Sequence, residues 1–239
     1  MKILADTHTH SMASGHAYST IQENIRAAAE KGLKLIALTD HAPAMQNTTS
    51  HAYFANLHVI PEELFGVRVL KGVELNIIDF EGTLDLDEQT LSRLDISIAS
   101  LHTPCISSGT KEENTRACIC AMENPLVDIL GHPGDPRYPM DFEEVFKVAK
   151  RTGTILEINN ASLVPGGIRS GSDENIEQIL RMSMKEDVPV VVSSDAHFYT
   201  GIGDIFYVER IMEKVGFPED LVLNTDPQKL LYTIKRNKG

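Results

Sequence analysis

The sequence is poor in cysteine, in long apolar runs and in positive charge. Its cysteines, Cys105, Cys118 and Cys120, lack the C-x-x-C spacing of a zinc knuckle or a redox pair. We therefore expect buried, reduced thiols in a cytosolic protein. No apolar run is long enough to cross a bilayer, so we expect no membrane partner. Because the chain reaches Asp6 before a signal-peptide hydrophobic region can form, we predict a cytoplasmic location.

Lysine and arginine are scarce, since 22 of them stand against 34 acidic residues and give a net charge of −12. This balance argues against nonspecific attraction to a long polyanion, and we expect no nucleic-acid partner. It does not argue against a small anionic substrate, provided that cations are bound locally. We find no linker, charge block or low-complexity tract either. The 239 residues therefore predict one domain over 1–239 with a large core.

Apolar strand-like segments alternate with helix-like segments along the chain. We predict strands at 3–5, 33–38, 67–73, 94–101, 126–130, 154–158 and 188–192. Helices are expected at 21–32, 112–122, 139–149 and 204–215, after an N-cap at Ser172, and from Pro227 onward. Residues 42–56 are predicted to form an active-site loop. Nearly continuous Val/Ile/Leu strands indicate a parallel sheet covered by helices.

Histidine is abundant, with nine residues, and most of these histidines follow a predicted strand. His8 and His10 alternate along an extended chain, so both face one side and can hold a divalent cation. The possible metal ligands at or just after strand ends are His8, His10, His16, His41, Glu74, His102, His132, Asp195 and His197. A seven-stranded (β/α)7 barrel resembling a TIM barrel gathers such residues at its C-terminal face. A doubly wound open sheet, the structural alternative, gathers them poorly.

Nine ligands are more than the three or four that one zinc ion takes, which predicts a cluster of two or three ions. With a bridging carboxylate, nine side chains give about ten metal bonds, roughly three per ion for three ions. Each ion then keeps a position for water or substrate, as catalytic sites do. His51 and His58 fall in or beside the long loop and are predicted to lie on the surface or in a lid.

Several motifs resemble those of the PHP (polymerase and histidinol phosphatase) family. They are Asp6-x-His8-x-His10, Thr39-Asp40-His41, Gly72-Val73-Glu74, Leu101-His102, Gly131-His132-Pro133 and Ser194-Asp195-Ala196-His197. His16-Ala17-Tyr18-Ser19-Thr20, Leu156-Glu157-Ile158-Asn159-Asn160 and Gly171-Ser172-x-Glu174-Asn175 resemble its YcdX-type phosphatase branch. The resemblance implies a distorted seven-stranded barrel with three zinc ions, or with manganese or iron in their place.

The resemblance also implies how the ligands are shared among the ions. One ion takes His8, His10, Glu74 and Asp195; a second shares Glu74 and adds His102 and His132; the third takes His16, His41 and His197. Asp6 and Asp40 are expected either to orient imidazoles as outer-shell acceptors or to cap strand ends.

Three dications with two anionic ligands leave a local charge of about +4, because ligating histidine is neutral. Such a centre attracts a phosphate dianion, and it lowers the pKa of bound water to about 7. We therefore predict a phosphatase in which a metal-bound hydroxide attacks a small phosphomonoester. Arg169 is a candidate to bind the substrate anion, and Arg137 is a weaker one; a solvated arginine is the alternative for both. The sequence identifies neither the leaving-group acid nor the oligomeric state.

Three other functions remain open at this point. An amidohydrolase-type metal hydrolase also begins with H-x-H, but Glu74, His197 and the absence of a bridging lysine at a strand end argue against it. A PHP phosphodiesterase or exonuclease uses the same metals, although the sequence has no basic strip for nucleic acid. A non-catalytic metal-binding module predicts filled coordination spheres, which nine ligands for three ions do not provide.

Overall fold

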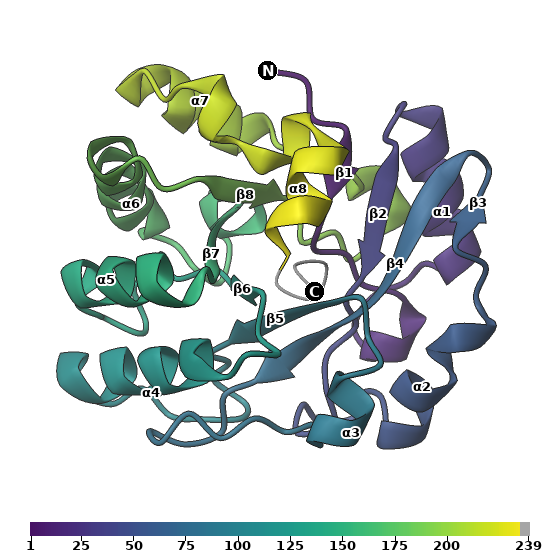
Figure 1. The fold of residues 1–239 in the computed structure, drawn as a ribbon, viewed down its shortest axis with the longest axis horizontal. Helices are drawn as coiled ribbons and strands as arrows, with labels where there is room; N and C mark the ends of the chain where they lie inside the picture. The colour runs from purple at the N-terminus through teal and green to yellow at the C-terminus, as the bar shows by residue number, and fades with distance from the viewer. Residues whose placement is uncertain (235–239) are drawn as a thin grey trace.

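A computed structural model describes residues 1–234, and its centre is a parallel sheet (Figure 1). Along the sheet the strands follow chain order: β1 (Ala5–Asp6), β2 (Leu35–Leu38), β4 (Val67–Asn76), β5 (Ile96–Ser100), β6 (Ile129–Leu130), β7 (Ile155–Asn159) and β8 (Val190–Ser193). Each neighbouring pair is parallel. A short strand, β3 (Glu63–Leu64), pairs antiparallel with β4. The predicted α/β fold with parallel strands in barrel order is confirmed.

Within residues 1–234, the backbones of the first and last strands of this order bond to each other only near their carboxyl ends. There the His10 N–H donates to the Ala196 carbonyl at 2.9 Å, and the Asp195 N–H donates to the His8 carbonyl at 3.0 Å. Toward the other end, Asn224 lies between the strands: its Oδ1 accepts from Val192 N–H at 2.7 Å. The barrel is therefore nearly closed, distorted by an inserted segment, and tied together by backbone that carries predicted ligands.

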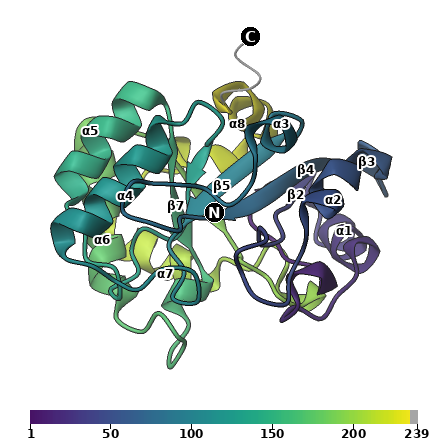
Figure 2. The same cartoon turned by 90° about the horizontal axis from the view of Figure 1, so that it is seen from below.

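Helices pack around the sheet, as Figure 2 shows. The longer ones are α1 (Ile21–Glu30), α4 (Lys111–Glu123), α5 (Phe142–Thr152), α6 (Ser172–Glu186) and α7 (Phe206–Val215). Their apolar faces and the outward side chains of the strands form one core cluster. A second cluster fills the barrel interior, where Leu35, Ile96 and Ile129 meet Leu230 and Leu231 of α8 (Pro227–Thr233). Helix α8 thus closes the end of the barrel opposite the strands' carboxyl termini.

Local signals account for most helix boundaries. Thr20 and Glu23 form the reciprocal capping box of α1, and Pro227 is the first residue of α8. Several predicted starts are wrong: α4 begins at Lys111 rather than at residue 112, and α7 begins at Phe206 rather than at residue 204. Helix α5 begins at Phe142 rather than at residue 139, because the Asp141 carboxylate caps its first amides. Helix α6 begins at Ser172, with Gly171 at the N-cap instead.

Short helices escaped prediction because one or two turns show too little periodicity. Helix α2 (His51–Asn56) occupies the end of the expected loop, the 3₁₀ turn η2 (Leu57–Val59) follows directly, and α3 (Glu88–Leu91) comes after β4. Further 3₁₀ turns are η1 (Met12–Ser14), η3 (Ala161–Leu163), η4 (Tyr199–Gly201), η5 (Glu219–Leu221) and η6 (Leu223–Thr225). No helix within residues 1–234 combines the length and apolar character needed to span a bilayer.

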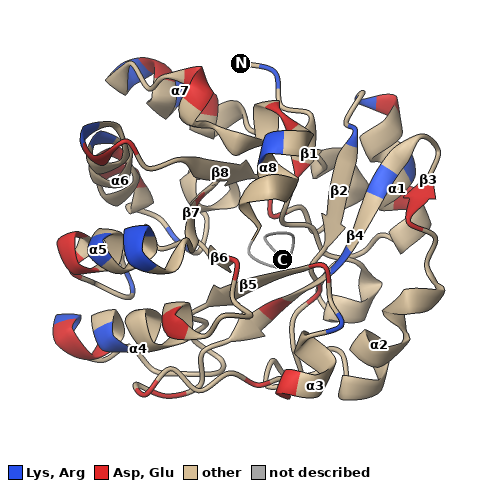
Figure 3. Cartoon of the chain, in the orientation of Figure 1, with Lys and Arg blue, Asp and Glu red and all other residues tan. Residues whose placement is uncertain are grey.

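Charges and thiols are distributed as expected for a folded core with a polar outside. Figure 3 shows Lys and Arg interspersed with Asp and Glu on α4, α5, α6 and α7, and cross-helix pairs such as Lys150–Glu186 at 3.1 Å join them. The three cysteines are free thiols. Cys118 is buried, which raises its pKa to about 12, whereas Cys105 and Cys120 are only partly buried, so the expectation of buried thiols is wrong for these two.

Candidate metal centre

All nine predicted ligand side chains lie at or just beyond the carboxyl ends of the strands. Seven of them are buried: His8, His10, His41, Glu74, His102, His132 and Asp195. His16 is exposed, and the side chain of His197 is 32% exposed. Residues spread from position 8 to position 197 therefore converge on one side of the barrel, as the strand-end pattern predicts.

The carboxylate of Glu74 lies at the centre of this group. Its Oε2 is 2.7 Å from His41 Nδ1 and 3.3 Å from His8 Nε2. Its Oε1 is 3.1 Å from both His102 Nε2 and His132 Nε2. Burial raises the pKa of Glu74, but the surrounding imidazoles outweigh burial and hold it well below its ordinary value. A carboxylate with different histidines at its two oxygens has the arrangement of a bridging ligand.

Asp195 is the second carboxylate of the group, and its two oxygens face different partners. Oδ1 is 3.1 Å from His10 Nε2 and 3.6 Å from His197 Nδ1. Oδ2 is 2.9 Å from Nη1 of Arg169, a buried arginine. Asp195 has a φ of 54°, a left-handed conformation that costs a non-glycine residue free energy and is common at functional sites. One oxygen is thus turned to the histidines while the other is held by a cation.

Several ligand atoms of this group lie close together, and some of the buried ones make no hydrogen bond. Nε2 of His16 lies 3.0 Å from Nε2 of His197. Among the buried side-chain atoms of residues 1–234, His41 Nδ1, His102 Nε2 and Glu74 Oε2 make no hydrogen bond. Unsatisfied buried nitrogen and oxygen lone pairs are costly unless a cation takes them up. Imidazole and carboxylate are also the ligand types that zinc prefers, so these residues fit a metal cluster.

Residues 1–234 contain three groups in which all ligand atoms of the group lie within 4.8 Å of one another. They are His8–His10–Glu74, His41–Glu74–His102 and His10–His41–His197. The first falls within the set implied for one ion. The other two cross the implied sets, because His41 lies next to Glu74 and His10 as well as beside His16 and His197. The division of ligands among ions therefore remains a proposal.

The pKa values of His8 and His10 are shifted in opposite directions. Burial lowers the pKa of His8, but the carboxylates of Glu157 and Glu74 outweigh burial and raise it well above the ordinary value. Burial lowers the pKa of His10 far below that value, and neighbouring His41 lowers it further. His10 is therefore neutral and ready to act as a ligand, whereas His8 holds a proton that a bound cation replaces.

Glu157 of β7 contacts two of the predicted ligands, although the sequence analysis assigned it no role. It is buried; its Oε1 accepts from His8 Nδ1 at 2.7 Å, and its Oε2 accepts from the backbone N–H of His132 at 2.6 Å. The Ser193 hydroxyl also donates to Oε1. This contact directs the His8 Nε2 lone pair toward Glu74 and Asp195, as outer-shell carboxylates do for metal-ligating imidazoles. The available signal was a glutamate with apolar residues on both sides in a predicted strand.

Asp6 and Asp40 do not accept from any imidazole in the part of the chain that the structure describes. Asp6 accepts from the Ser194 hydroxyl at 2.5 Å and the Gly203 N–H at 2.8 Å, so it joins strand ends as the alternative prediction holds. Asp40 is linked to His10 through Ser14. The Ser14 Oγ donates to Asp40 at 2.6 Å and lies 3.0 Å from His10 Nδ1.

One more residue contacts a predicted ligand, and the structure also places Arg137, His51 and His58. Asn76 Oδ1 accepts from His102 Nδ1 at 2.8 Å. Arg137 pairs with Asp135 at 2.6 Å. The surface prediction for His51 and His58 is confirmed, since both are exposed.

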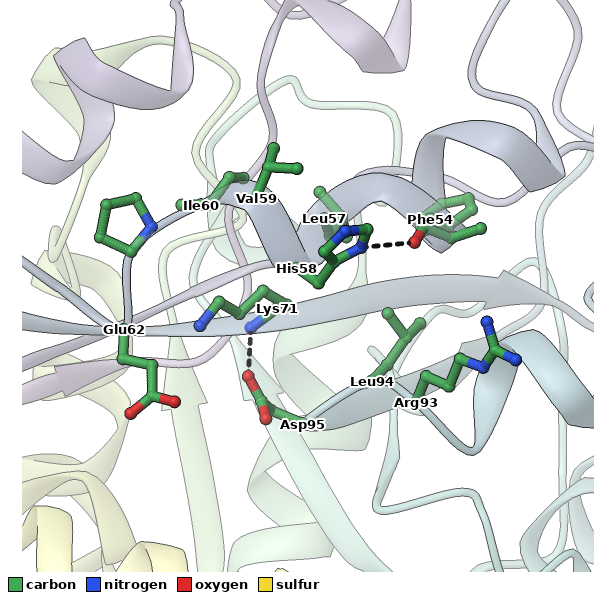
Figure 4. A pocket seen from close by; sticks show the side chains of 12 residues that line it. Phe54, Leu57, His58, Val59, Ile60, Glu62, Lys71, Arg93, Leu94 and Asp95 are labelled. Atoms are coloured by element: carbon green, nitrogen blue, oxygen red, sulfur yellow. Dashed lines mark hydrogen bonds between the residues drawn. The ribbon is translucent and has the colours of Figure 1, made fainter.

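A cavity of about 610 Å³ lies elsewhere, between residues 54–62, Lys71 and residues 93–95 (Figure 4). None of the nine predicted ligands lines it. In Figure 4 Asp95 faces the backbone of Lys71, whose N–H donates to that carboxylate at 2.8 Å. Because residues 93–95 precede β5, this cavity lies toward the strands' amino ends, away from the metal-ligand group.

The sequence matches one protein-family model and is similar to proteins described as probable phosphatases. The PHP domain family model matches residues 6–161. A probable phosphatase of Thermoanaerobacter sp. (strain X514) is 49% identical over 239 residues, covering 100% of this chain and 97% of that protein. A probable phosphatase of Acetivibrio thermocellus is 47% identical over 238 residues, covering 100% of this chain and 98% of that protein.

Solved structures of low sequence identity share the fold. Histidinol phosphate phosphatase from Lactococcus lactis, complexed with zinc, L-histidinol and phosphate, has a TM-score of 0.58 at 17% identity and covers 90% of this chain and 94% of that chain. The putative histidinol phosphatase from Listeria monocytogenes has a TM-score of 0.61 at 17% identity, covering 83% and 97% respectively. These likenesses support the barrel described above.

Proposed function

Since this chain belongs to the PHP family and is a metal-dependent phosphatase, we propose that it hydrolyses a small phosphomonoester at a centre of three zinc ions. The convergence of seven histidines around the buried carboxylates of Glu74 and Asp195 carries this proposal. Nine ligands exceed the needs of one zinc ion, and they leave open positions when shared among three.

His8, His10, Glu74 and Asp195 would hold one ion, Glu74 with His102 and His132 a second, and His16, His41 and His197 the third. Bound zinc supplies Lewis acidity and a hydroxide nucleophile near neutral pH. Glu74 would contribute to holding two of the ions, because different histidines face its two oxygens. Glu157 keeps His8 in the tautomer that presents Nε2.

Arg169 is proposed to bind the substrate's phosphoryl group. Its Nη1 donates to Asp195 Oδ2 at 2.9 Å, while its buried Nε lies 3.7 Å from Asp135 Oδ2 and makes no hydrogen bond within residues 1–234. A guanidinium can hold a carboxylate with one edge and a phosphoryl oxygen with another. Arg169 would then fix both a metal ligand and the substrate anion.

The test is to assay phenyl phosphate and an aryl phosphodiester side by side on zinc-loaded protein. We expect hydrolysis of the monoester only; activity confined to the diester would identify a nuclease-type enzyme instead. The Glu74→Gln variant keeps the size of the side chain but removes the charge, so turnover should be lost. Full activity in that variant would refute the bridging role of Glu74.

A further inference from the structure

The metal-ligand group is open to solvent on one side. The seven buried ligands are at most 6% exposed, whereas His16 is exposed and the His197 side chain is 32% exposed. A phosphate that reaches the group must approach past these two imidazoles. The alcohol portion of the ester then extends outward over the segments that carry His16 and His197.

Tyr18 lies on the first of these segments. Burial alternates along it: His16 and Tyr18 are exposed, whereas Ala17 is 4% and Ser19 is 0% exposed. Because His16 and Tyr18 are exposed while Ala17 between them is buried, both side chains face the solvent side of this segment. Tyr18 is 74% exposed.

The second segment supplies two more aromatic rings. Phe198 and Tyr199 are 46% and 40% exposed, and their ring centroids are 4.6 Å apart. The segments are tied together, because Tyr18 N–H donates to the His197 carbonyl at 2.9 Å and Tyr199 N–H donates to Ser19 Oγ at 2.8 Å. A single exposed aromatic needs no explanation, but three on two joined segments beside an opening indicate a binding surface.

We propose that Tyr18, Phe198 and Tyr199 form an aromatic subsite for the alcohol portion of the substrate. The substrate class is then phosphate esters of aromatic alcohols rather than of sugars or polyols. The inference rests on the proposed phosphatase site, which holds the phosphate end. Tyr18 contributes by stacking against the substrate ring, an interaction that favours offset or edge-to-face contact.

The experiment measures binding of two non-hydrolysable ligands, phenylphosphonate and methylphosphonate, to the zinc-loaded protein by calorimetry. Wild type should bind the phenyl compound more tightly. Tyr18→Ser should reduce that preference by about 2- to 12-fold, the range expected for one aromatic pair. Tyr232→Ser is the matched control: Tyr232 is 75% exposed but lies on α8, at the other end of the barrel, and its loss should leave the preference unchanged.

A wild-type protein without phenyl preference, or a Tyr18→Ser variant that retains the full preference, would overturn the subsite. Equal weakening of both ligands would also overturn it, because that result indicates an indirect effect on the metal group. Turnover of phenyl phosphate is measured in parallel. Binding with phenyl preference but without turnover would refute the phosphatase site's chemistry while leaving the aromatic subsite intact.

Discussion

Glu157 and His8 are 149 positions apart in sequence, yet Glu157 Oε1 accepts from His8 Nδ1 at 2.7 Å inside the barrel. The same carboxylate accepts from the backbone of His132, which has a φ of 30° in the left-handed region. Strand β7 supplies none of the nine predicted ligands. Through Glu157, β7 instead contacts His8, which follows β1, and His132, which follows β6.

Glu157→Gln should weaken zinc binding by roughly 10- to 100-fold, the usual effect of losing an outer-shell partner of a metal-ligating histidine. An amide has only one acceptor oxygen, so it can no longer accept from both the His132 N–H and the His8 ring. Zinc affinity is measured by competition with a chromophoric chelator. Glu213→Gln, an exposed change on α7, is the control and should match wild type. Unchanged affinity in Glu157→Gln would refute the positioning role.

Arg169→Lys should raise KM for phenyl phosphate by at least about 10-fold, because charge-assisted hydrogen bonds to the phosphoryl group are lost. A lysine cannot hold Asp195 and a phosphate at once. Steady-state kinetics separates this effect on KM from an effect on kcat. Arg181→Lys serves as control, since Arg181 pairs with Glu177 on α6 and its side chain is 57% exposed. An unchanged KM with a lower kcat would assign Arg169 to Asp195 alone.

Asn224→Ala should lower the free energy of unfolding by about 2 to 4 kcal/mol, because buried backbone groups on both sides lose their partners. Asn224 is fully buried; it accepts from Val192 N–H at 2.7 Å and donates to the Ala5 carbonyl at 3.1 Å. Urea unfolding measures the loss. The exposed Asn56→Ala change should cost much less. Equal stability of the two variants would show that the gap between β1 and β8 needs no bridge.

His102 makes the metal-free protein sensitive to acid. Burial lowers its pKa to about 4 from an ordinary 6.5. Between these values the unfolded chain binds a proton that the native ring does not, so stability falls as pH decreases from 6.5 toward 4. The contribution is roughly 3 kcal/mol.

Urea unfolding of chelated protein at pH 6.5 and at pH 4 checks this contribution. His102→Gln should lose less stability than wild type over that range. The variant at exposed His58, His58→Gln, should follow wild type. Identical losses in wild type and His102→Gln would contradict the assignment.

The barrel and the nine strand-end residues could be predicted because their signals are local. Continuous Val/Ile/Leu runs mark buried parallel strands, and residues such as Glu74 and His132 directly follow them. Topology then brings these ends together without further information. The 2.7 Å contact between Glu74 and His41 is a consequence of that order.

Contacts between distant side chains could not be read from the sequence. Nothing local to Glu157 indicates that it faces His8, and the pairing of Arg169 with Asp195 joins a loop to a strand end 26 positions away. Asp6 stands before a histidine as an orienting acceptor would, yet it bonds Ser194 and Gly203. Such partners depend on the packed geometry of several strands.

The most direct test of the metal centre is an anomalous difference map, recorded at the zinc edge from crystals of protein purified without chelator. We predict three peaks, each ligated by members of the set His8, His10, His16, His41, Glu74, His102, His132, Asp195 and His197. A map with no peak among these side chains, or with a single ion that satisfies all of its ligands, would contradict the account.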